Sequence, residues 1–501
     1  MRRRGAIVVG AGPVGLMLAG EIRLGGADVV VYEKLAAPTG ESRGVGFTRR
    51  AAEVFDQRGL LARLGEAESA LGHFGGVRID LGMLEEDHSS IRGVAQSRTE
   101  AMLEGWLGEL GVPVRRGYEV VDLRETADEV VIVYDGPDGR GEDIAEYLVG
   151  CDGARSVIRT LAGFDFPGSE PTRGIYTADI TGIETRHRPI GEKVPGGMVM
   201  AMNLEDGVLR IVIYEEGLRP QEKEGLSFSE MADAWQRMTG EDIHHAQVHW
   251  VSAFTDAARQ AAEYRRGRVF VAGDAAHVQL PAGAQGLSVG VQDAANLGWK
   301  LAAAINGWAS EGLLDSYHSE RHPVGQQLLR NAQASALLYL TGDEMEPLRS
   351  VMRELVAYKD AARHLAGMTS GLTIRYDMGP GKHPLLGLRM PPGHELELSD
   401  GSRIRVAELL HPARGVLICT GDRDEAARVA VAWSDRVDIV RGSWGSNVPG
   451  GPDTAPEAVL LRPDGYVAWA APGGDLAEAL CRWFGTPVAA GTAPLTVPAR
   501  A

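Results

Sequence analysis

A glycine-rich turn near the amino terminus constrains the fold of this chain more than any other feature. The apolar run 6–9 predicts a strand, a helix is predicted over 16–24, and the G-x-G-x-x-G motif between them consists of Gly10, Gly12 and Gly15. A second strand is predicted over 28–32, and Glu33 follows it 18 residues after the last glycine. Glycines let the backbone approach a pyrophosphate, and an acid about 20 residues further on binds the ribose. The segment therefore predicts a dinucleotide-binding α/β unit.

Charge and cysteine content narrow the function classes. The 501 residues carry 51 basic and 68 acidic side chains, a net charge of −17, which disfavours nucleic acid and anionic membranes as partners. The arginines at 2–4 and the apolar stretch 6–20 resemble a signal peptide, but the glycine motif interrupts that stretch. The cysteines lack C-x-x-C spacing, which excludes a zinc ribbon, and they are Cys151, Cys419 and Cys481. We expect a cytoplasmic enzyme.

The pattern along the chain predicts an α/β protein with several domains. Glycine makes up 65 residues, about 13% against a usual ~7%, which indicates many tight turns and close approaches to a large ligand. The proline-rich stretch 379–394 is predicted to be a linker, and one long helix is predicted over 348–368. The predicted domains are a discontinuous Rossmann-type domain (1–175 plus 265–378), an antiparallel β domain (176–264) and a thioredoxin-like domain with βαββα order (395–501).

Two further motifs follow predicted strands. Asp152 and Gly153 come after the strand 147–149, and Gly273 and Asp274 come after the strand 269–272. A single Asp-Gly pair is usually only a turn. Ligands of open α/β sheets bind at the carboxyl ends of strands, so three such strand ends in one chain indicate one extended cofactor. Asp274 is predicted to hold ribityl hydroxyls, and the following helix to point its positive end at an isoalloxazine ring.

Together these motifs resemble the single-component flavin-dependent aromatic hydroxylases over nearly the whole chain. The segments 40–44, 72–76, 195–200 and 461–469 are most similar to the angucycline-type hydroxylases of aromatic polyketides. The resemblance implies bound FAD, with contacts at Gly10, Gly12, Gly15, Glu33, Lys34, Arg43, Gln96, Asp152, Gly273, Asp274, Pro281, Gly283, Gln285, Gly286, Leu287 and Ser288. Family members usually have glycine at 284 and often asparagine at 288. Here these positions are Ala284 and Ser288, which puts the side-chain contact at 288 in question.

The resemblance also implies a reaction. NADPH would reduce FAD, dioxygen would add to the reduced flavin, and the flavin hydroperoxide would hydroxylate a phenolic polycyclic polyketide of the angucyclinone type. Baeyer–Villiger oxygen insertion on the same scaffold remains open. A halogenase is disfavoured because no Trp-x-Trp-x-Ile-Pro segment occurs. A non-enzymatic nucleotide-binding module is disfavoured because it would not need three strand-end sites. NADPH is expected to bind only transiently. The protein is expected to be a monomer or a homodimer.

Candidate substrate contacts are fewer. His73 lies in a glycine-rich segment, where it is either a cavity residue or a turn residue, and the alternating Met198, Met200 and Met202 fit a substrate pocket or an ordinary sheet core equally well. No acid–base pair stands out, so no catalytic side chain is assigned. The sequence around Ser288 matches the nucleophile elbow of α/β hydrolases, but a loop precedes it where a strand is required. The pair His318 and His322 is interpreted as packed or solvated, and no metal is predicted.

Overall fold

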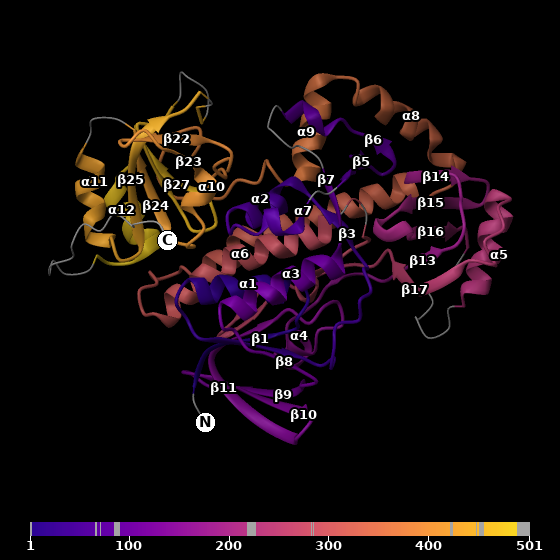
Figure 1. The fold of residues 1–501 in the computed structure, drawn as a ribbon, viewed down its shortest axis with the longest axis horizontal. Helices are drawn as coiled ribbons and strands as arrows, with labels where there is room; N and C mark the ends of the chain where they lie inside the picture. Colours follow the sequence, from indigo (N-terminus) through magenta and orange to yellow (C-terminus); the bar gives the residue numbers. More distant parts are fainter. Residues whose placement is uncertain are drawn as a thin grey trace.

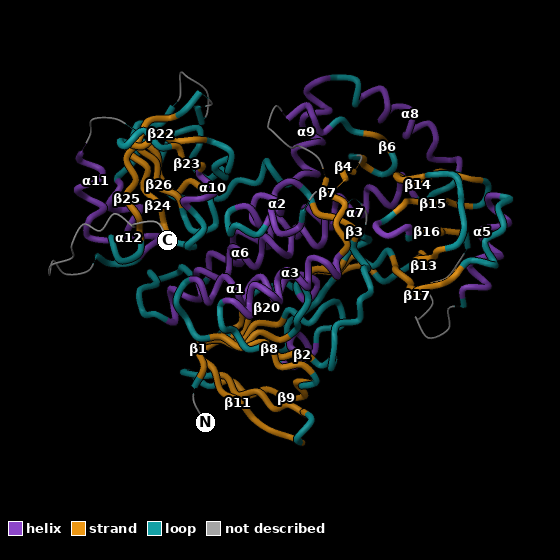
Figure 2. Tube along the Cα trace, viewed as in Figure 1, coloured by secondary structure: helices purple, strands orange, loops and turns teal. Residues whose placement is uncertain are grey.

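The computed structural model describes residues 3–65, 68–70, 72–84, 91–217, 227–281, 283, 285–420, 424–446, 448–449 and 455–487. A body built on a parallel sheet lies between an antiparallel sheet and a carboxy-terminal lobe (Figures 1 and 2). Helix α7 (Asp315–Tyr339) connects the three parts. Its Glu320 contacts the lobe, and its Tyr339 packs near the antiparallel sheet.

The parallel sheet confirms the elements predicted around the glycine turn. The predicted strands over 6–9 and 28–32 are β1 (Arg4–Val9) and β2 (Val29–Glu33), and the predicted helix is α1 (Pro13–Leu24). The strand order is β19-β20-β11-β1-β2-β8, and β20, β11, β1, β2 and β8 run parallel. Helix α1 packs against α6 (Gln285–Ile305) and α3 (Gln96–Glu109). The other strands are β8 (Val114–Arg116), β9 (Glu119–Glu125), β10 (Val130–Gly136), β11 (Gly139–Gly150), β19 (Arg265–Arg266) and β20 (Val269–Val271).

The antiparallel sheet has the order β14-β15-β16-β13-β17. Its strands are β13 (Gly174–Thr181), β14 (Arg188–Val194), β15 (Gly197–Asn203), β16 (Leu209–Glu215) and β17 (Gln247–Thr255). The sequence also predicts a hairpin of strands over 198–204 and 208–214, joined by a turn at 205–207, and this hairpin is confirmed as β15 and β16. Strand β14 and helix α5 (Phe228–Thr239) were not predicted. Helix α5 covers one face of the sheet, where its Trp235 is fully buried. The opposite face points toward α7 and the parallel-sheet body.

The single helix predicted over 348–368 is wrong. The structure has two helices instead, α8 (Glu346–Leu355) and α9 (Lys359–Ser370). The break falls where Tyr358 adopts an extended backbone conformation, with φ −83° and ψ 125°, and caps the second helix. The side chains of Leu348, Val351 and Leu355 on α8 are exposed.

The carboxy-terminal lobe has a mixed sheet of order β23-β22-β25-β24-β26-β27, in which β24 and β25 are parallel. The segment predicted as a linker packs onto this lobe, since Met390 is fully buried and its N–H donates to the Gly465 carbonyl. The lobe contains β22 (Glu395–Leu398), β23 (Arg403–Arg405), α10 (Val406–Leu409), β24 (Gly415–Cys419), α11 (Asp424–Ala430), β25 (Val437–Trp444), β26 (Ala458–Leu461), β27 (Val467–Ala470) and α12 (Leu476–Phe484). Residues 488–501 of the predicted last domain lie outside the described part.

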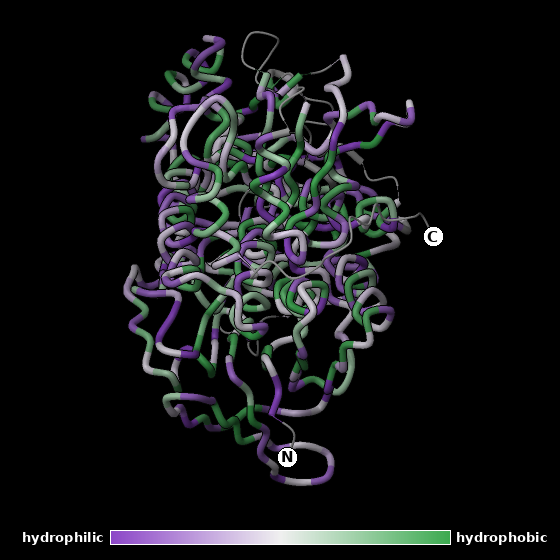
Figure 3. Tube along the Cα trace, turned by 90° about the vertical axis from the view of Figure 1, so that its left-hand side faces the viewer, coloured by the Kyte–Doolittle hydropathy of each residue, from purple (hydrophilic) through white to green (hydrophobic). Residues whose placement is uncertain are grey.

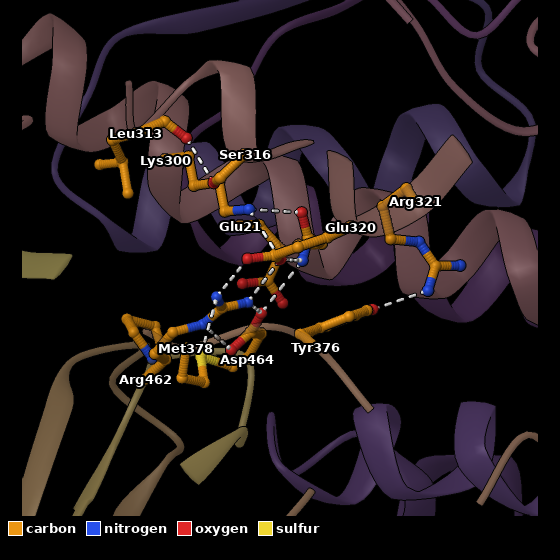
Figure 4. A network of polar contacts seen from close by, with 12 residues as sticks. Glu21, Lys300, Leu313, Ser316, Glu320, Arg321, Tyr376, Met378, Arg462 and Asp464 are labelled. Atoms are coloured by element: carbon orange, nitrogen blue, oxygen red, sulfur yellow. Dashed lines mark hydrogen bonds and ion pairs between the residues drawn. The ribbon is translucent and has the colours of Figure 1, made fainter. Parts of the chain in front are cut away.

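A buried ionic network attaches the lobe to the body (Figure 4). The Arg462 guanidinium donates to both carboxylate oxygens of Glu320, at 2.6 and 2.9 Å, and also contacts Asp464. Lys300 of α6 donates to Glu320 at 2.9 Å. Four aromatic rings surround the same guanidinium at 4.5–5.8 Å, and they belong to Trp299, Tyr376, Tyr466 and Trp483. The lobe is thus docked by a charged side chain inserted between α6 and α7.

Polar and apolar residues are distributed along the chain as expected for a body, an antiparallel sheet and a lobe that pack against one another. In the side view, polar chain segments lie along much of the outline and many apolar ones run through the middle (Figure 3). Among the described residues, no helix combines the length and apolar character that crossing a membrane requires.

Candidate active site

The glycine turn has the geometry of a phosphate-binding site. Gly10 has φ +107°, and a Cβ there would collide with the Cys151 carbonyl oxygen. A Cβ on Gly15 would collide with the Gly10 carbonyl oxygen, so packing within the protein requires both glycines. Gly12 differs, because a Cβ there would have no atom within 4 Å. The open side of the turn at Gly12 is therefore where a ligand can approach the backbone.

Glu33 lies beside this turn. Its carboxylate accepts hydrogen bonds from the Ala11 N–H at 2.8 Å and from the Leu35 N–H at 2.9 Å. These two bonds fix the carboxylate at the carboxyl end of β2. The carboxylate can accept further hydrogen bonds, as it would from the hydroxyl groups of a ribose. The neighbouring Lys34 is exposed.

The predicted contacts Arg43, Gln96 and Asp274 come together from distant parts of the chain. The Gln96 side-chain oxygen accepts from the Gly44 N–H at 3.1 Å, which fixes the loop that carries Arg43. Burial deep in the protein raises the pKa of Asp274, and the charges of His277 and Arg43 partly offset this shift. The Asp274 side chain is nevertheless exposed, so it faces accessible space inside the molecule. Such a space, bordered by a carboxylate and a guanidinium, fits a ribityl-pyrophosphate chain.

The carboxylate of Asp152 is hydrogen-bonded within its own turn. Its carboxylate accepts from the backbone N–H groups of Val157 (2.7 Å) and Ile158 (3.1 Å) and from the Ser156 hydroxyl. It thereby caps the short helix α4 (Val157–Leu161). Burial raises the pKa of Asp152, and these hydrogen bonds offset part of the shift. A contact from Asp152 to the cofactor remains a prediction.

An ionic network that sequence reasoning missed holds the Gly273–His277 turn. Asp293 of α6 accepts from the Gly273 N–H at 3.2 Å, from the His277 Nε2–H at 2.9 Å and from the Arg321 Nε–H at 2.7 Å. Burial alone would raise the pKa of Asp293, but the Arg321 charge and the His277 hydrogen bond lower it. The one available signal was an aspartate inside the apolar segment 289–303, because a buried charge needs partners.

The loop before α6 and the first turn of that helix form the next part of the site. Ser288 is 1% exposed, and its hydroxyl accepts from the Thr48 N–H at 2.8 Å. A serine buried inside a helix is not the exposed nucleophile of a hydrolase elbow. Pro281, Gly283, Gln285, Gly286 and Leu287 are described, whereas Ala282 and Ala284 lie outside the described residues.

A cavity of about 50 Å³ lies beside Ser288, between α6, α7 and α9. Several of its lining side chains are polar, including Gln285, Gln327 and Asn331. The Oε1 of Gln292 is buried there with no hydrogen-bond partner among the described residues. A buried amide oxygen of this kind needs a donor, which a water molecule in the cavity would supply.

The face of the antiparallel sheet that points toward the body is graded in polarity. The register places side chains of β13, β15, β16 and β17 in three parallel rows. From the apolar to the charged end these rows are Met198, Tyr214, Ile175 and Phe254; then Met200, Val212, Thr177 and Ser252; then Met202, Arg210, Asp179 and Trp250. Leu280, which directly precedes the predicted cofactor loop 281–288, packs with the apolar row. The sheet face and the cofactor loop therefore border the same region.

The predicted substrate residues separate along this face. Met198 is buried, and Met200 packs beside it in the same apolar cluster. Met202 lies at the charged end, opposite Arg210. His73 stacks on Tyr339, with ring centroids 5.6 Å apart and planes 7° apart, and Tyr339 belongs to the cluster of Met198. Burial lowers the pKa of His73, which favours a neutral ring.

The charged end of this face touches the Arg43 loop. Arg210 donates to Asp179 at 2.7 and 2.8 Å and to the Ser42 carbonyl. The Trp250 indole N–H donates to the same Asp179 carboxylate at 2.8 Å. The antiparallel sheet is thereby bonded to the residue next to Arg43.

The two histidines of α7 are side by side. The rings of His318 and His322 have centroids 4.7 Å apart, and the His318 Nδ1 accepts from the Tyr264 N–H at 3.3 Å. In the described part of the chain, no three histidine, cysteine or acidic side chains gather as metal ligands would.

The fold and these sites define a nucleotide-cofactor-binding α/β protein, and comparison with known proteins specifies the family. The family model "FAD binding domain" matches residues 4–332, and the model "Aromatic-ring hydroxylase, C-terminal" matches residues 383–487. The chain belongs to the FAD-dependent aromatic-ring hydroxylases, which are flavoprotein monooxygenases that use NAD(P)H and dioxygen. The open glycine turn and the accessible Asp274 fit FAD.

Three relatives illustrate this membership. The chain is 54% identical to CabE, an aromatic hydroxylase from angucycline biosynthesis, with a TM-score of 0.93 over 97% of this chain and 100% of that one. It is 40% identical to OxyS anhydrotetracycline hydroxylase from Streptomyces rimosus, with a TM-score of 0.90 and coverage of 97% and 100%. It is 42% identical to the rifampicin monooxygenase of Streptomyces venezuelae, over 96% of this chain and 99% of that protein.

Proposed function

We propose that this monooxygenase hydroxylates a phenolic, polycyclic aromatic polyketide of the angucyclinone type, with NADPH as the reductant. The observation that carries the proposal is the graded sheet face, whose apolar end lies against Leu280, directly before the predicted cofactor loop 281–288. A fused-ring polyketide has the matching composition, with an apolar surface and polar oxygens along its edge. The similarity to CabE supports this substrate class.

The side chains have separate tasks in this reaction. The glycine turn, Glu33, Arg43 and Asp274 bind and orient FAD, which when bound takes a hydride from NADPH and activates dioxygen. The neutral His73 offers a hydrogen bond to a phenolic hydroxyl, and the flexible Met200 adapts to the ring surface. No side chain is needed as a strong base if the phenol is already polarised by such a bond.

The domains divide these tasks as the sequence predicts. Residues 1–175 and 265–378 form the Rossmann-type FAD domain, and residues 176–264 form the substrate domain. The described sheet of that domain runs from Gly174 to Thr255, and the chain returns to the body at β18 (Ala258–Gln260). Beyond the segment 379–394, the described lobe from β22 to α12 is a thioredoxin-like domain without a redox pair; its Cys419 is buried and its Cys481 is exposed.

NADPH consumption with different aromatic compounds tests the substrate class. The purified protein should show the two visible bands of bound flavin, and an angucyclinone should accelerate NADPH oxidation at least tenfold more than a simple phenol does. A tetracycline precursor and a rifamycin serve as competing polycycles. If one of these is preferred, or if no polycycle accelerates the reaction, the angucyclinone assignment fails while the flavin assignment stands.

Product structure distinguishes the two oxygen-insertion reactions. Hydroxylation and Baeyer–Villiger insertion both add one oxygen atom, so product mass cannot separate them. Carbon NMR of the product can, because a new phenol or alcohol carbon indicates hydroxylation. A new ester carbonyl would instead establish ring insertion.

A further inference from the structure

Tyr339, the last residue of α7, is held between the turn that follows β5 (His73–Phe74) and strand β14. Its ring stacks on His73, with the ring planes 7° apart. A Cβ on Gly76 would lie 2.8 Å from the Tyr339 ring, and a Cβ on Gly191 would collide with its hydroxyl oxygen. Both glycines have positive φ, +82° and +79°. Two closely approaching backbones therefore leave room for this ring and little freedom for it to move.

The Tyr339 hydroxyl is buried and has no hydrogen-bond partner among the described residues. Burial raises the pKa of this phenol, so it stays protonated and can donate. A buried tyrosine hydroxyl normally has a partner, and a phenylalanine would pack here without leaving a polar atom unpaired. The side chain as a whole is only partly buried, so its ring borders accessible space inside the molecule. A ligand in that space would supply the missing acceptor.

This hydroxyl lies at the apolar end of the substrate sheet. Tyr339 packs in the same cluster as Met198, Tyr214 and Leu280, which border the region where the proposed function places the substrate. A Cβ on Gly191 would contact both the Tyr339 hydroxyl and the Met198 Sδ, so these two atoms are neighbours. A methionine side chain is unbranched and flexible, so a ligand can displace it at low cost. Rotation of Met198 would thus give a ligand access to the hydroxyl.

His73 presents a second donor beside the first. Its Nδ1 accepts from the Gly76 N–H at 3.4 Å, which places the proton of the neutral ring on Nε2. Burial lowers the pKa of His73, so the ring is uncharged near neutral pH. Like Tyr339, His73 is only partly buried. The stacked pair therefore offers two neutral donors, one O–H and one N–H.

Two neighbouring donors match a particular arrangement of oxygens on a polycyclic ligand. A phenol beside a ring carbonyl donates its own O–H to that carbonyl, so both oxygens are left to accept hydrogen bonds from outside. An isolated phenol would instead bring a further donor to a place that already has two. A site built to donate to an oxygen discriminates strongly against a ligand that lacks it, because the buried donor then stays unpaired.

We propose that Tyr339 determines substrate specificity by donating a hydrogen bond to a ketone or quinone carbonyl of the substrate, while His73 donates to the neighbouring phenolic oxygen. This inference rests on the proposed function, since it concerns the same sheet face. It narrows the substrate class to polycycles that carry a phenol next to a carbonyl group.

Equilibrium binding of two matched polycycles to the oxidised, FAD-loaded enzyme tests the proposal without turnover. The probes are 1-hydroxyanthraquinone, which has its phenol beside a carbonyl, and 1-hydroxyanthracene, which lacks carbonyls; a shift in flavin absorbance reports binding. Tyr339→Phe should raise the Kd for the quinone about three- to tenfold, as loss of one neutral hydrogen bond does, and the Kd for 1-hydroxyanthracene less than twofold. The melting temperature of the ligand-free variant should not fall, because the deleted hydroxyl has no partner there.

Tyr176→Phe is the matched control. Tyr176 belongs to the same sheet but packs with Trp235 on the face that α5 covers, so the variant should leave the ratio of the two Kd values unchanged. The proposal is overturned if Tyr339→Phe weakens both probes equally or neither of them. A wild-type enzyme that binds neither probe would also overturn it.

NADPH oxidation with an angucyclinone separates this inference from the proposed function. Tyr339→Phe should raise the KM severalfold and keep kcat within about twofold of the wild type. If Tyr339→Phe weakens only the quinone but no angucyclinone accelerates NADPH oxidation by the wild type, the recognition role stands and the reaction assignment fails. If the wild type is accelerated and the variant has an unchanged KM, the reaction assignment stands and the recognition role fails.

Discussion

At the scale of single residues, Asp293 of α6 connects Arg321 of α7 to the Gly273–His277 turn, which is predicted to contact FAD. Asp293→Asn keeps the side-chain size but removes the charge that pairs with Arg321, at a cost of about 3–5 kcal/mol in stability. Because the same carboxylate holds the Gly273 N–H, we expect the Kd for FAD to rise at least tenfold. Fluorescence titration of the apoprotein with FAD measures this change.

Glu320→Gln is the matched control for that experiment. It also breaks a buried carboxylate–arginine pair, but Glu320 contacts Arg462 and Lys300 and has no bond to the cofactor turn. Its melting temperature should fall comparably while the Kd for FAD changes less than threefold. Equal losses of FAD affinity in both variants would show that Asp293 acts through general stability alone.

Arg210 makes the contact between the substrate sheet and the Arg43 loop. Arg210→Gln removes the hydrogen bonds to Asp179 and to the Ser42 carbonyl, so the Arg43 loop is no longer held in position against the sheet. We expect kcat/KM to fall about 10–100-fold, as misplacement near a reacting centre does, when NADPH oxidation is measured with the polyketide.

The same domain contains a second arginine–carboxylate–tryptophan trio, which serves as the control for Arg210. Arg188 pairs with Glu241 at 2.8 Å, and the Trp235 indole N–H donates to that carboxylate at 3.2 Å. This trio does not bond to the Arg43 loop, so Arg188→Gln should lower stability and leave kcat/KM within about threefold. A similar kinetic loss in both variants would contradict the proposed role of Arg210.

At the scale of elements, Ser288 joins the first turn of α6 to the start of α2 (Arg49–Asp56). Ser288→Ala leaves the buried Thr48 N–H without its acceptor, which costs about 1–3 kcal/mol. We expect a lower melting temperature with the flavin spectrum and NADPH oxidation retained. Loss of turnover with intact FAD binding would instead assign Ser288 a chemical role.

Sequence patterns predicted the elements where local spacing decides the structure. The strand–glycine–helix unit at 4–24 and the hairpin of β15 and β16 follow from apolar periodicity and turn residues. The single helix over 348–368 was wrong because the chain breaks at Tyr358, between α8 and α9, where no glycine or proline stands at 356–358 to indicate it. Its apolar spacing at Leu348 and Val351 also does not mark a buried face, because both side chains are exposed. Periodicity identifies an apolar face but does not say what covers it.

At the scale of the whole molecule, the lobe attachment should make stability depend on acid. Burial alone would raise the pKa of Glu320, but the charges of Arg462 and Lys300 outweigh burial and hold the pKa at about 2. The folded pKa lies below the ordinary value of 4.5, so this stabilisation is complete above pH 4.5 and is lost as the pH falls toward 2.

Melting temperatures of the wild type and Glu320→Gln between pH 7 and pH 3 check this sign. The wild type should melt higher at pH 7, and the difference should shrink steadily below pH 4.5. A difference that stays constant would show that folding does not lower the pKa of Glu320, and one that grows in acid would show that folding raises it.

The candidate site was predictable only where its residues belong to motifs. Gly12, Glu33 and Asp274 stand at strand ends, so their spacing along the chain indicated their neighbourhood. Arg210 approaches Ser42 across 168 residues, and Asp293 approaches Arg321 across 28, so no local pattern reveals either contact. Asp152 shows the converse: a motif residue whose carboxylate is occupied by its own turn.

The insertion of Arg462 between α6 and α7 limits how this enzyme can be recombined with its relatives. A carboxy-terminal lobe taken from another member would bring its own side chain to a site shaped by Glu320, Lys300 and Trp299. A mismatch there would bury an unpaired charge. A functional chimaera should therefore take the lobe and the residues of α6 and α7 that surround Arg462 from the same parent protein.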